Sequence, residues 1–237
     1  MERRLIAALA CRNTGSRLYG KPIQNLDVKS QYTILDNIIS CLKSISVIDE
    51  IVLGISEGTE NEVFKRFADS HGLKFIIGDE TDVLMRLVQC GRKGQATDIF
   101  RVTSESPFVN YEAVEGAWEI FKKSEADGLF LDDVIDGCGF EIISMSALEL
   151  SHSNGETRHR SEMCTLYIRE NIQNFNIIKM LPDPCLKRKD LRLTVDNPED
   201  LVVCRQVFAE LQHLAPTIPL TLIVSFLDDN PKLIDML

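Results

Sequence analysis

The feature that most constrains the fold of this chain is a regular alternation of short apolar runs with amphipathic stretches through residues 1–125. Leu5–Ala10 is apolar at every position, as expected for a strand that is buried on both faces. Thr33–Ser44 then carries its apolar side chains at helical spacing. The same pattern repeats, and it predicts strands at Ile51–Ser56, Phe75–Ile77 and Ile99–Thr103 and helices at Glu60–His71, Asp79–Lys93 and Tyr111–Lys123, with Gly72 and Gly94 ending the second and third helices.

Strands and helices in regular alternation form crossover connections, which place the strands parallel in one sheet. We therefore expect an α/β fold, a three-layer sandwich with a mainly parallel, Rossmann-like sheet. From about residue 128 the pattern is less regular, so we expect residues 1–237 to form a single domain with a looser region at about 128–190. In this second half the sequence predicts strands at Gly128–Leu131, Phe140–Ile143, Asn176–Met180 and Leu191–Asp196, and helices near Ser144–Leu150, Ser161–Asn171, Pro198–His213 and Pro219–Leu227.

The charge of the chain is unevenly distributed. The formal net charge is −10, from 26 basic and 36 acidic side chains, and this excludes a protein that follows a nucleic acid along its phosphates. Residues 1–30 nevertheless carry six basic against two acidic side chains, a net charge of +4, so the remaining 207 residues carry −14. A local positive cluster on an acidic protein indicates a small anionic ligand near the N-terminus.

The cysteines and the hydropathy indicate the compartment. Seven cysteines, odd in number and widely spaced, favour reduced thiols over a disulfide framework or a zinc site. No apolar run approaches the ~18 residues that span a bilayer, and the apolar part of the N-terminus is too short for a secretory signal. We therefore expect a cytoplasmic protein without a membrane partner.

The segment that follows the first predicted strand carries most of the chemistry. Arg12, Arg17 and Lys21 supply three positive charges within ten residues, and Gly15 and Gly20 allow the backbone to approach a ligand closely. Such a loop at the carboxyl edge of a parallel sheet suits a polyphosphate. The alternative is a solvated basic loop without a ligand.

The same segment contains the beginning of a Walker A pattern, Gly15-x4-Gly20-Lys21. The next residue is Pro22, which offers no hydroxyl to Mg²⁺. We therefore reject a P-loop ATPase.

Further motifs follow the basic loop in a fixed order. Arg-x4-Arg-x2-Gly-Lys comes after the first strand, Gly78–Arg86 after the third, Arg101–Pro107 on the fourth, and Arg192–Leu201 before a C-terminal helix. With Ile48–Val52 at the second strand, they resemble the signature of the CMP-sugar synthetase group of nucleotidyltransferases, which includes the Kdo and sialic-acid cytidylyltransferases. The pattern is most similar to the branch named after spore-coat polysaccharide biosynthesis cytidylyltransferases. The resemblance covers about residues 5–210.

The resemblance implies a fold of the nucleotide-diphospho-sugar transferase type and a reaction. An acceptor oxygen attacks the α-phosphate of CTP and pyrophosphate leaves, in the biosynthesis of a surface glycan. By this resemblance the acceptor would be an acidic sugar or a related phosphate or phosphonate, and the partner subunit would be a second copy of the chain. The region at about 128–190 would serve acceptor binding and dimerisation. Arg12, Arg17 and Lys21 would neutralise the triphosphate, and Glu105 and Asp196 would hold Mg²⁺. The nucleotide-binding residues implied are Arg12, Ser16, Arg17, Gly20, Lys21, Asp82, Arg86 and Arg101.

The alternation of side chains along extended strands partly supports the placement of Glu105 and Asp196 in one site. If the fourth strand stays extended, Arg101, Thr103 and Glu105 share one face, and Asp196 shares a face with Thr194. Two alternatives remain open. Asp196 could belong to the start of the helix that Pro198 begins, and Glu105 could be an ordinary surface carboxylate.

The sequence departs from the family pattern at three positions. Glu105 replaces an Asp, Ser104 replaces a Gly, and Met163 stands after Glu162 where this branch has a His. These changes leave open an altered acceptor or lost activity. A nucleotidyltransferase that uses another NTP or a sugar 1-phosphate, and a catalytically weak nucleotide-binding or partner subunit, therefore stay as alternatives.

Overall fold

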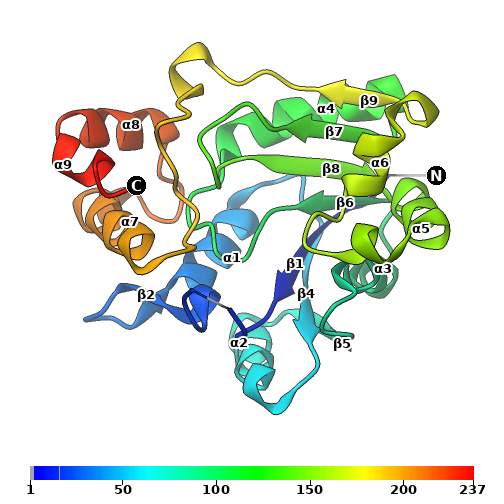
Figure 1. The fold of residues 1–237 in the computed structure, drawn as a ribbon, viewed down its shortest axis with the longest axis horizontal. Helices are drawn as coiled ribbons and strands as arrows, with labels where there is room; N and C mark the ends of the chain where they lie inside the picture. Colours follow the sequence, from blue (N-terminus) through cyan, green and yellow to red (C-terminus); the bar gives the residue numbers. More distant parts are fainter. Residues whose placement is uncertain (1–2, 16) are drawn as a thin grey trace.

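One seven-stranded sheet organises the molecule. The computed structural model describes residues 3–15 and 17–237, so the predicted nucleotide-binding residue Ser16 lies outside the described residues. The strand order is β5-β4-β1-β6-β8-β7-β9, and neighbouring strands are parallel except at β8, which is antiparallel to both of its neighbours (Figure 1). The strands are β1 (Leu5–Cys11), β4 (Glu50–Ser56), β5 (Lys74–Gly78), β6 (Asp98–Arg101), β7 (Gly128–Leu131), β8 (Phe140–Ser144) and β9 (Ile177–Lys179), and β2 (Asn25–Asp27) and β3 (Tyr32–Thr33) form a separate hairpin.

Helices cover both faces of the sheet because successive side chains of a buried strand point to opposite sides. Leu5, Ala7 and Leu9 of β1 belong to the core shared with α1, α2, α4, α7 and α8, whereas Ile6 and Ala8 belong to the core shared with α3, α5 and α6. The predicted α/β sandwich with a mainly parallel sheet is thus confirmed. The helices are α1 (Ile34–Ser44), α2 (Val63–His71), α3 (Val83–Gly94), α4 (Val114–Ser124), α5 (Met145–Asn154), α6 (Leu166–Glu170), α7 (Pro198–Leu211), α8 (Leu220–Asp228) and α9 (Pro231–Ile234).

The third helix differs from its prediction at both ends. It begins after Asp82, because the carboxylate of Asp79 accepts from the backbone N–H groups of Thr81 and Asp82 and holds these residues in a turn. At the other end Gln95, not Gly94, takes the left-handed conformation, with φ 57°. Gly94 is the last helical residue and lies against β1, where an added Cβ would come within 3.0 Å of Ile6.

Two predictions for the second half were wrong in detail. Leu191–Asp196, fully described in the structure, buries Leu191, Leu193 and Val195 as the alternation predicts, but it forms an isolated bridge at Arg192 instead of a strand. The segment crosses the edge of the sheet, where the Leu193 N–H donates to the Asp136 carbonyl and the Val195 N–H donates to the Glu105 carbonyl. Helix α6 occupies only Leu166–Glu170 of the predicted Ser161–Asn171, because residues 161–165 form bends and a turn, in which the Glu162 carbonyl accepts a hydrogen bond from the Arg101 side chain.

The domain arrangement stays a prediction, although strands β7, β8 and β9 of the looser region belong to the same sheet as β1. Among the helices of residues 3–15 and 17–237, none combines the length and the apolar character that a bilayer crossing requires. The carboxyl ends of the parallel strands β4, β1 and β6 meet at one edge of the sheet, where an α/β fold places its binding crevice.

Candidate active site

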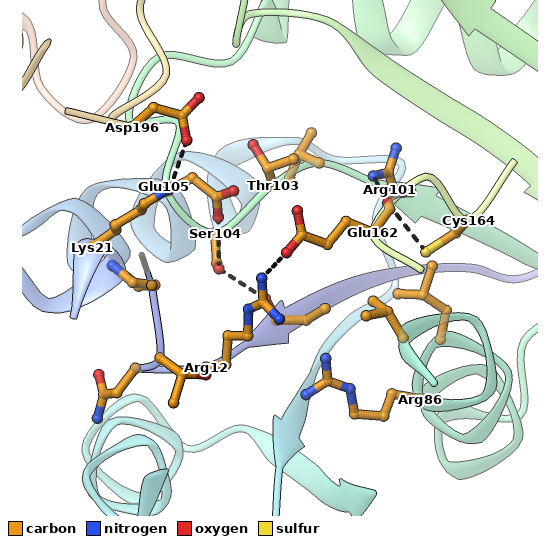
Figure 2. A pocket seen from close by; sticks show the side chains of 18 of the residues that line it. Arg12, Lys21, Arg86, Arg101, Thr103, Ser104, Glu105, Glu162, Cys164 and Asp196 are labelled. Atoms are coloured by element: carbon orange, nitrogen blue, oxygen red, sulfur yellow. Dashed lines mark hydrogen bonds and ion pairs between the residues drawn. The ribbon is translucent and has the colours of Figure 1, made fainter. Parts of the chain in front are cut away.

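Two adjoining cavities lie at this carboxyl edge. The first, of about 230 Å³, is bounded by the loop after β1, by α3, by the chain after β6 and by Glu162 and Asp196 (Figure 2). The second, of about 410 Å³, lies between that same chain, the region 131–141 and α6. Arg101, Val102 and Thr103 line both cavities and form the wall that they share.

The loop after β1 presents its cations to a carboxylate inside the first cavity. Lys21 Nζ lies 2.5 Å from Asp196 Oδ1, and Arg17 Nη2 lies 3.3 Å from the same oxygen. The loop is closed by a hydrogen bond from the Gly20 N–H to the Asn13 carbonyl, 2.9 Å. Gly20 has φ 62°, a conformation that favours glycine, and it starts the short helical turn that carries Lys21. The structure therefore brings Arg17, Gly20 and Lys21 to Asp196.

The carboxylate of Asp196 is not used to start α7. Asn197 is the N-cap residue and Asp200 completes its capping box. Asp200 also accepts from the Asp196 N–H at 2.9 Å, which fixes the backbone and leaves the Asp196 side chain to the cavity. Partial burial opposes ionisation of Asp196, but the hydrogen bond and charge of Lys21 outweigh it and lower the pKa below its usual value.

Glu105 reaches the cavity through a turn and not along a strand. Strand β6 ends at Arg101, and the chain then turns at Ser104, whose hydroxyl donates to the Ala10 carbonyl at 2.8 Å. The Glu105 carbonyl accepts from the Val195 N–H at 3.1 Å, so the segments that carry Glu105 and Asp196 are joined by their backbones. Both carboxylates line the first cavity.

Two carboxylates are a suitable but incomplete set of protein ligands for a divalent cation. Within residues 3–15 and 17–237, no group of three His, Cys, Asp or Glu side chains is arranged to hold a metal ion. Mg²⁺ is usually held by one or two carboxylates together with substrate phosphates and water. Glu105 and Asp196 therefore fit a metal that arrives with a nucleotide.

Arg12 and Arg101 are both engaged with acidic partners. Arg12 forms an ion pair with Glu162 at the rim of the first cavity. Arg101 donates from Nη1 to Glu141 at 2.7 Å and from Nη2 to the Glu162 carbonyl at 2.8 Å. The two arginines thus hold the chain around Glu162 against the wall between the cavities (Figure 2).

The buried carboxylate of Glu141 was missed by the sequence reasoning. It lies between Arg101 and Arg169, 2.7 Å from each, and Thr165 donates to it. Burial alone would raise its pKa, but the charge of Arg101 and the hydrogen bonds of Arg169 and Thr165 lower it below the usual value. A lone carboxylate between Phe140 and two isoleucines in a predicted buried strand was the available signal.

Asp82 does not join the other predicted residues. It caps α3 by accepting from the Met85 N–H at 2.9 Å, and its second oxygen lies 2.8 Å from His152 Nε2. It borders a separate depression with Arg160 and Gln89. Arg86, one helical turn further on, does line the first cavity.

Comparisons with curated proteins give two informative relatives. An uncharacterized protein of Methanocaldococcus jannaschii is 27% identical over 97% of this chain and 93% of its own length. The spore coat polysaccharide biosynthesis protein SpsF of Bacillus subtilis is 21% identical over 77% of this chain and 76% of its own length.

Solved structures share the fold. A cytidylyltransferase from Leptospira borgpetersenii superposes with a TM-score of 0.87 at 19% identity, covering 99% of this chain and 97% of its own. A CMP:2-keto-3-deoxy-manno-octonic acid synthetase complexed with CTP gives a TM-score of 0.64 at 14% identity, covering 87% and 99%. The Mycobacterium tuberculosis protein Rv0371c, in a complex with manganese, gives 0.60 at 12%, covering 86% and 99%.

The family follows from a match that spans most of the chain. A family model described as cytidylyltransferase matches residues 6–218, which include the basic loop, both cavities and helix α7. The resemblance stated from the sequence motifs is thereby confirmed. This chain belongs to the cytidylyltransferase family and is a nucleotidyltransferase.

Proposed function

We propose that this protein transfers a cytidylyl group from CTP to a small anionic acceptor, an acidic sugar or a related phosphate or phosphonate, and releases pyrophosphate. The observation that carries the proposal is the cluster of Lys21 and Arg17 around Asp196, with Glu105 joined to it through Val195, inside a cavity at the carboxyl edge of the sheet. The motif order that resembles CMP-sugar synthetases supports CTP as the donor.

The cations and the carboxylates have different tasks. Lys21 and Arg17 face Asp196, and a triphosphate offers them more charge than one carboxylate does. Arg12 can reach the same phosphates once it leaves Glu162. Glu105 and Asp196 would hold Mg²⁺, which supplies charge neutralisation at the phosphate oxygens when it is bound.

Catalysis then depends on position and charge. The protein orients the α-phosphate between the basic loop and the carboxylates, and these fixed charges stabilise the extra negative charge of the transition state. No covalent intermediate with the protein is required. The acceptor would lie in the second cavity, because only the wall of Arg101, Val102 and Thr103 separates it from the first.

The wider setting follows from the resemblance. We propose that the product serves surface glycan biosynthesis, that the protein is cytoplasmic and that it acts as a homodimer. All seven cysteines are free, and six of them are buried, in keeping with a reducing compartment.

The test combines binding with turnover. Thermal-shift measurements against the four NTPs with Mg²⁺ should show selective stabilisation by CTP. A coupled assay of pyrophosphate release over nonulosonic acids, sugar phosphates and phosphonates should then identify the acceptor. Stabilisation by another NTP would indicate a different nucleotidyltransferase, and no response to any nucleotide would indicate a weak nucleotide-binding or partner subunit.

A further inference from the structure

Glu162 is the acidic residue of the first cavity to which the proposed function gives no task. Among the described residues, the acidic ones that line this cavity are Glu105, Glu162 and Asp196, and the proposed metal occupies the first and the last. The Glu162 side chain is 64% exposed and forms an ion pair with Arg12. Figure 2 shows its carboxylate pointing into the cavity, above Arg12 and toward Glu105. A third carboxylate is therefore present where the reaction is proposed to occur.

The backbone of Glu162 is fixed, although its side chain is exposed. Arg101 donates from Nη2 to the Glu162 carbonyl at 2.8 Å and from Nη1 to Glu141 at 2.7 Å. Three residues after Glu162, the hydroxyl of Thr165 donates to the other oxygen of Glu141 at 2.7 Å. Glu141 is 5% exposed and belongs to β8, so it ties this segment to the sheet at two points. The carboxylate of Glu162 thus extends from a fixed position and remains free to turn.

This fixed position is the boundary between the two cavities. Glu162 lines the first cavity, the next residue, Met163, lines the second, and Arg101 lines both. In the proposed function the acceptor oxygen has to pass this boundary to reach the α-phosphate. A carboxylate at the boundary lies beside the oxygen that attacks.

An acceptor that attacks through a hydroxyl must lose a proton, and few groups can accept it. The described lining of both cavities contains no histidine. Glu141 is held by two arginines at 2.7 Å each, and Asp132 by two hydrogen bonds from Arg169. Asp136 lines the second cavity but not the first. Glu162 is the carboxylate that combines exposure with a place at the boundary.

We propose that Glu162 is the general base that takes the proton of the acceptor hydroxyl. The O–H bond breaks and its proton passes to a carboxylate oxygen of Glu162, while the acceptor oxygen bonds to the α-phosphorus. The bond from the α-phosphorus to the bridging oxygen breaks, and pyrophosphate leaves with that electron pair. The inference rests on the proposed function. It also selects among the proposed acceptors, because a phosphate or phosphonate oxygen is already ionised and needs no base, whereas the hydroxyl of an acidic sugar does.

The ion pair with Arg12 links this base to the nucleotide. A triphosphate carries more charge than one carboxylate and competes with Glu162 for Arg12. When Arg12 turns to the phosphates, the Glu162 carboxylate loses its partner and is available to the acceptor. Removal of the carboxylate should therefore affect turnover and not weaken nucleotide binding.

The experiment compares Glu162→Gln, Glu162→Asp and Glu162→Ala with wild type. Glu149→Gln is the matched control, because Glu149 is also an exposed glutamate paired with an arginine, Arg92, but it lines neither cavity. Pyrophosphate release from CTP with Mg²⁺ is measured with nonulosonic acids and, separately, with sugar phosphates and phosphonates. Calorimetry gives the CTP affinity, and a melting curve reports folding. The control should match wild type in all of these measurements.

We expect Glu162→Gln to lower kcat with a nonulosonic acid by about 100-fold or more, the usual contribution of a general base. Its CTP affinity should equal that of wild type or exceed it by up to about five-fold, because Arg12 is freed from an exposed ion pair. Glu162→Asp should keep part of the activity. Added formate should restore part of the turnover of Glu162→Ala by replacing the missing carboxylate, and it should not restore that of Asp196→Asn. The melting temperature should stay close to that of wild type in all three variants.

Several results would overturn the assignment. Wild-type turnover of a nonulosonic acid in the glutamine variant would exclude Glu162 as the base. A fall in CTP affinity that matches the fall in turnover would place Glu162 in nucleotide binding, and early melting without rescue by formate would give it a structural role. Wild-type release of pyrophosphate with phosphate or phosphonate acceptors alone would remove the need for a base and leave cytidylyl transfer intact. Failure of the wild-type protein to bind any nucleotide would instead refute the proposed function, and the assignment with it.

Discussion

Replacing Asp196 by asparagine keeps the size of the side chain and removes the charge that Lys21 and Arg17 face. The side chain of Asp196 is 26% exposed, and that of Arg17 is 54% exposed. Ion pairs of this partly exposed kind contribute about 0.2–1 kcal/mol each, so the free energy of unfolding should fall by at most about 2 kcal/mol. The start of α7 should survive, because Asn197 and Asp200 form its cap.

Binding and turnover should respond in opposite directions. Without metal, Lys21 and Arg17 no longer share their charge with a carboxylate, and the CTP affinity in EDTA should rise by up to about five-fold for each pair lost. Turnover with Mg²⁺ should fall by about 100-fold or more, because one of the two proposed metal ligands has lost its charge. Calorimetry in EDTA and pyrophosphate release over a range of Mg²⁺ concentrations measure the two effects.

The control for this substitution is Asp228→Asn at the end of α8, outside the lining of both cavities, where Asp228 forms a partly exposed ion pair with Arg188. It should change neither CTP affinity nor turnover. The reasoning fails if Asp196→Asn turns over at the wild-type rate. It also fails if the variant melts many degrees earlier and keeps its specific activity, because Asp196 would then serve the fold.

Three further predictions follow from the same contacts. Lys21→Ala and Arg17→Ala should each weaken CTP binding by about 10- to 100-fold without unfolding the chain, whereas the control Lys29→Ala, at an exposed position, should not. Calorimetry measures the CTP affinity, and wild-type affinity in both variants would exclude the basic loop from the CTP site. Glu105→Gln should reduce turnover by orders of magnitude and raise the Mg²⁺ requirement, whereas Glu105→Asp should retain activity; unchanged kinetics in the glutamine variant would exclude Glu105 as a metal ligand. Glu141→Gln should lower the free energy of unfolding by about 1.5–3 kcal/mol, because the partly buried Arg101 and Arg169 lose a charged hydrogen-bond partner while Arg169 keeps Asp132. Because the folded-state pKa of Glu141 is lowered, its contribution is complete above the ordinary carboxylate range near pH 4.3 and is lost as the pH falls through the folded value. Urea titrations at several pH values should therefore show a steeper loss of stability with falling pH in wild type than in the variant, which keeps the other carboxylates.

The sequence by itself determined the parallel half of the fold and the position of the basic loop. The apolar patterns of Leu5–Ala10 and Thr33–Ser44 predict a strand and a helix because hydrophobic periodicity is a local property of the sequence. Regular alternation of strands and helices then leaves few possible topologies. The loop from Arg12 to Lys21 follows the first strand, so it had to reach the carboxyl edge of the sheet. Local chemistry also marked the cap of α7, with Pro198 at its first position.

Only the tertiary structure decided which charges meet. Lys21 and Asp196 are 175 residues apart in the chain, and their contact depends on the path of residues 191–196 across the sheet edge, where alternation predicted a strand. Arg86 and Asp82 looked equivalent as members of one motif, yet one points into the first cavity and the other caps a helix. Ion pairs and burial depend on distances between segments far apart in sequence, and periodicity carries no information about those distances.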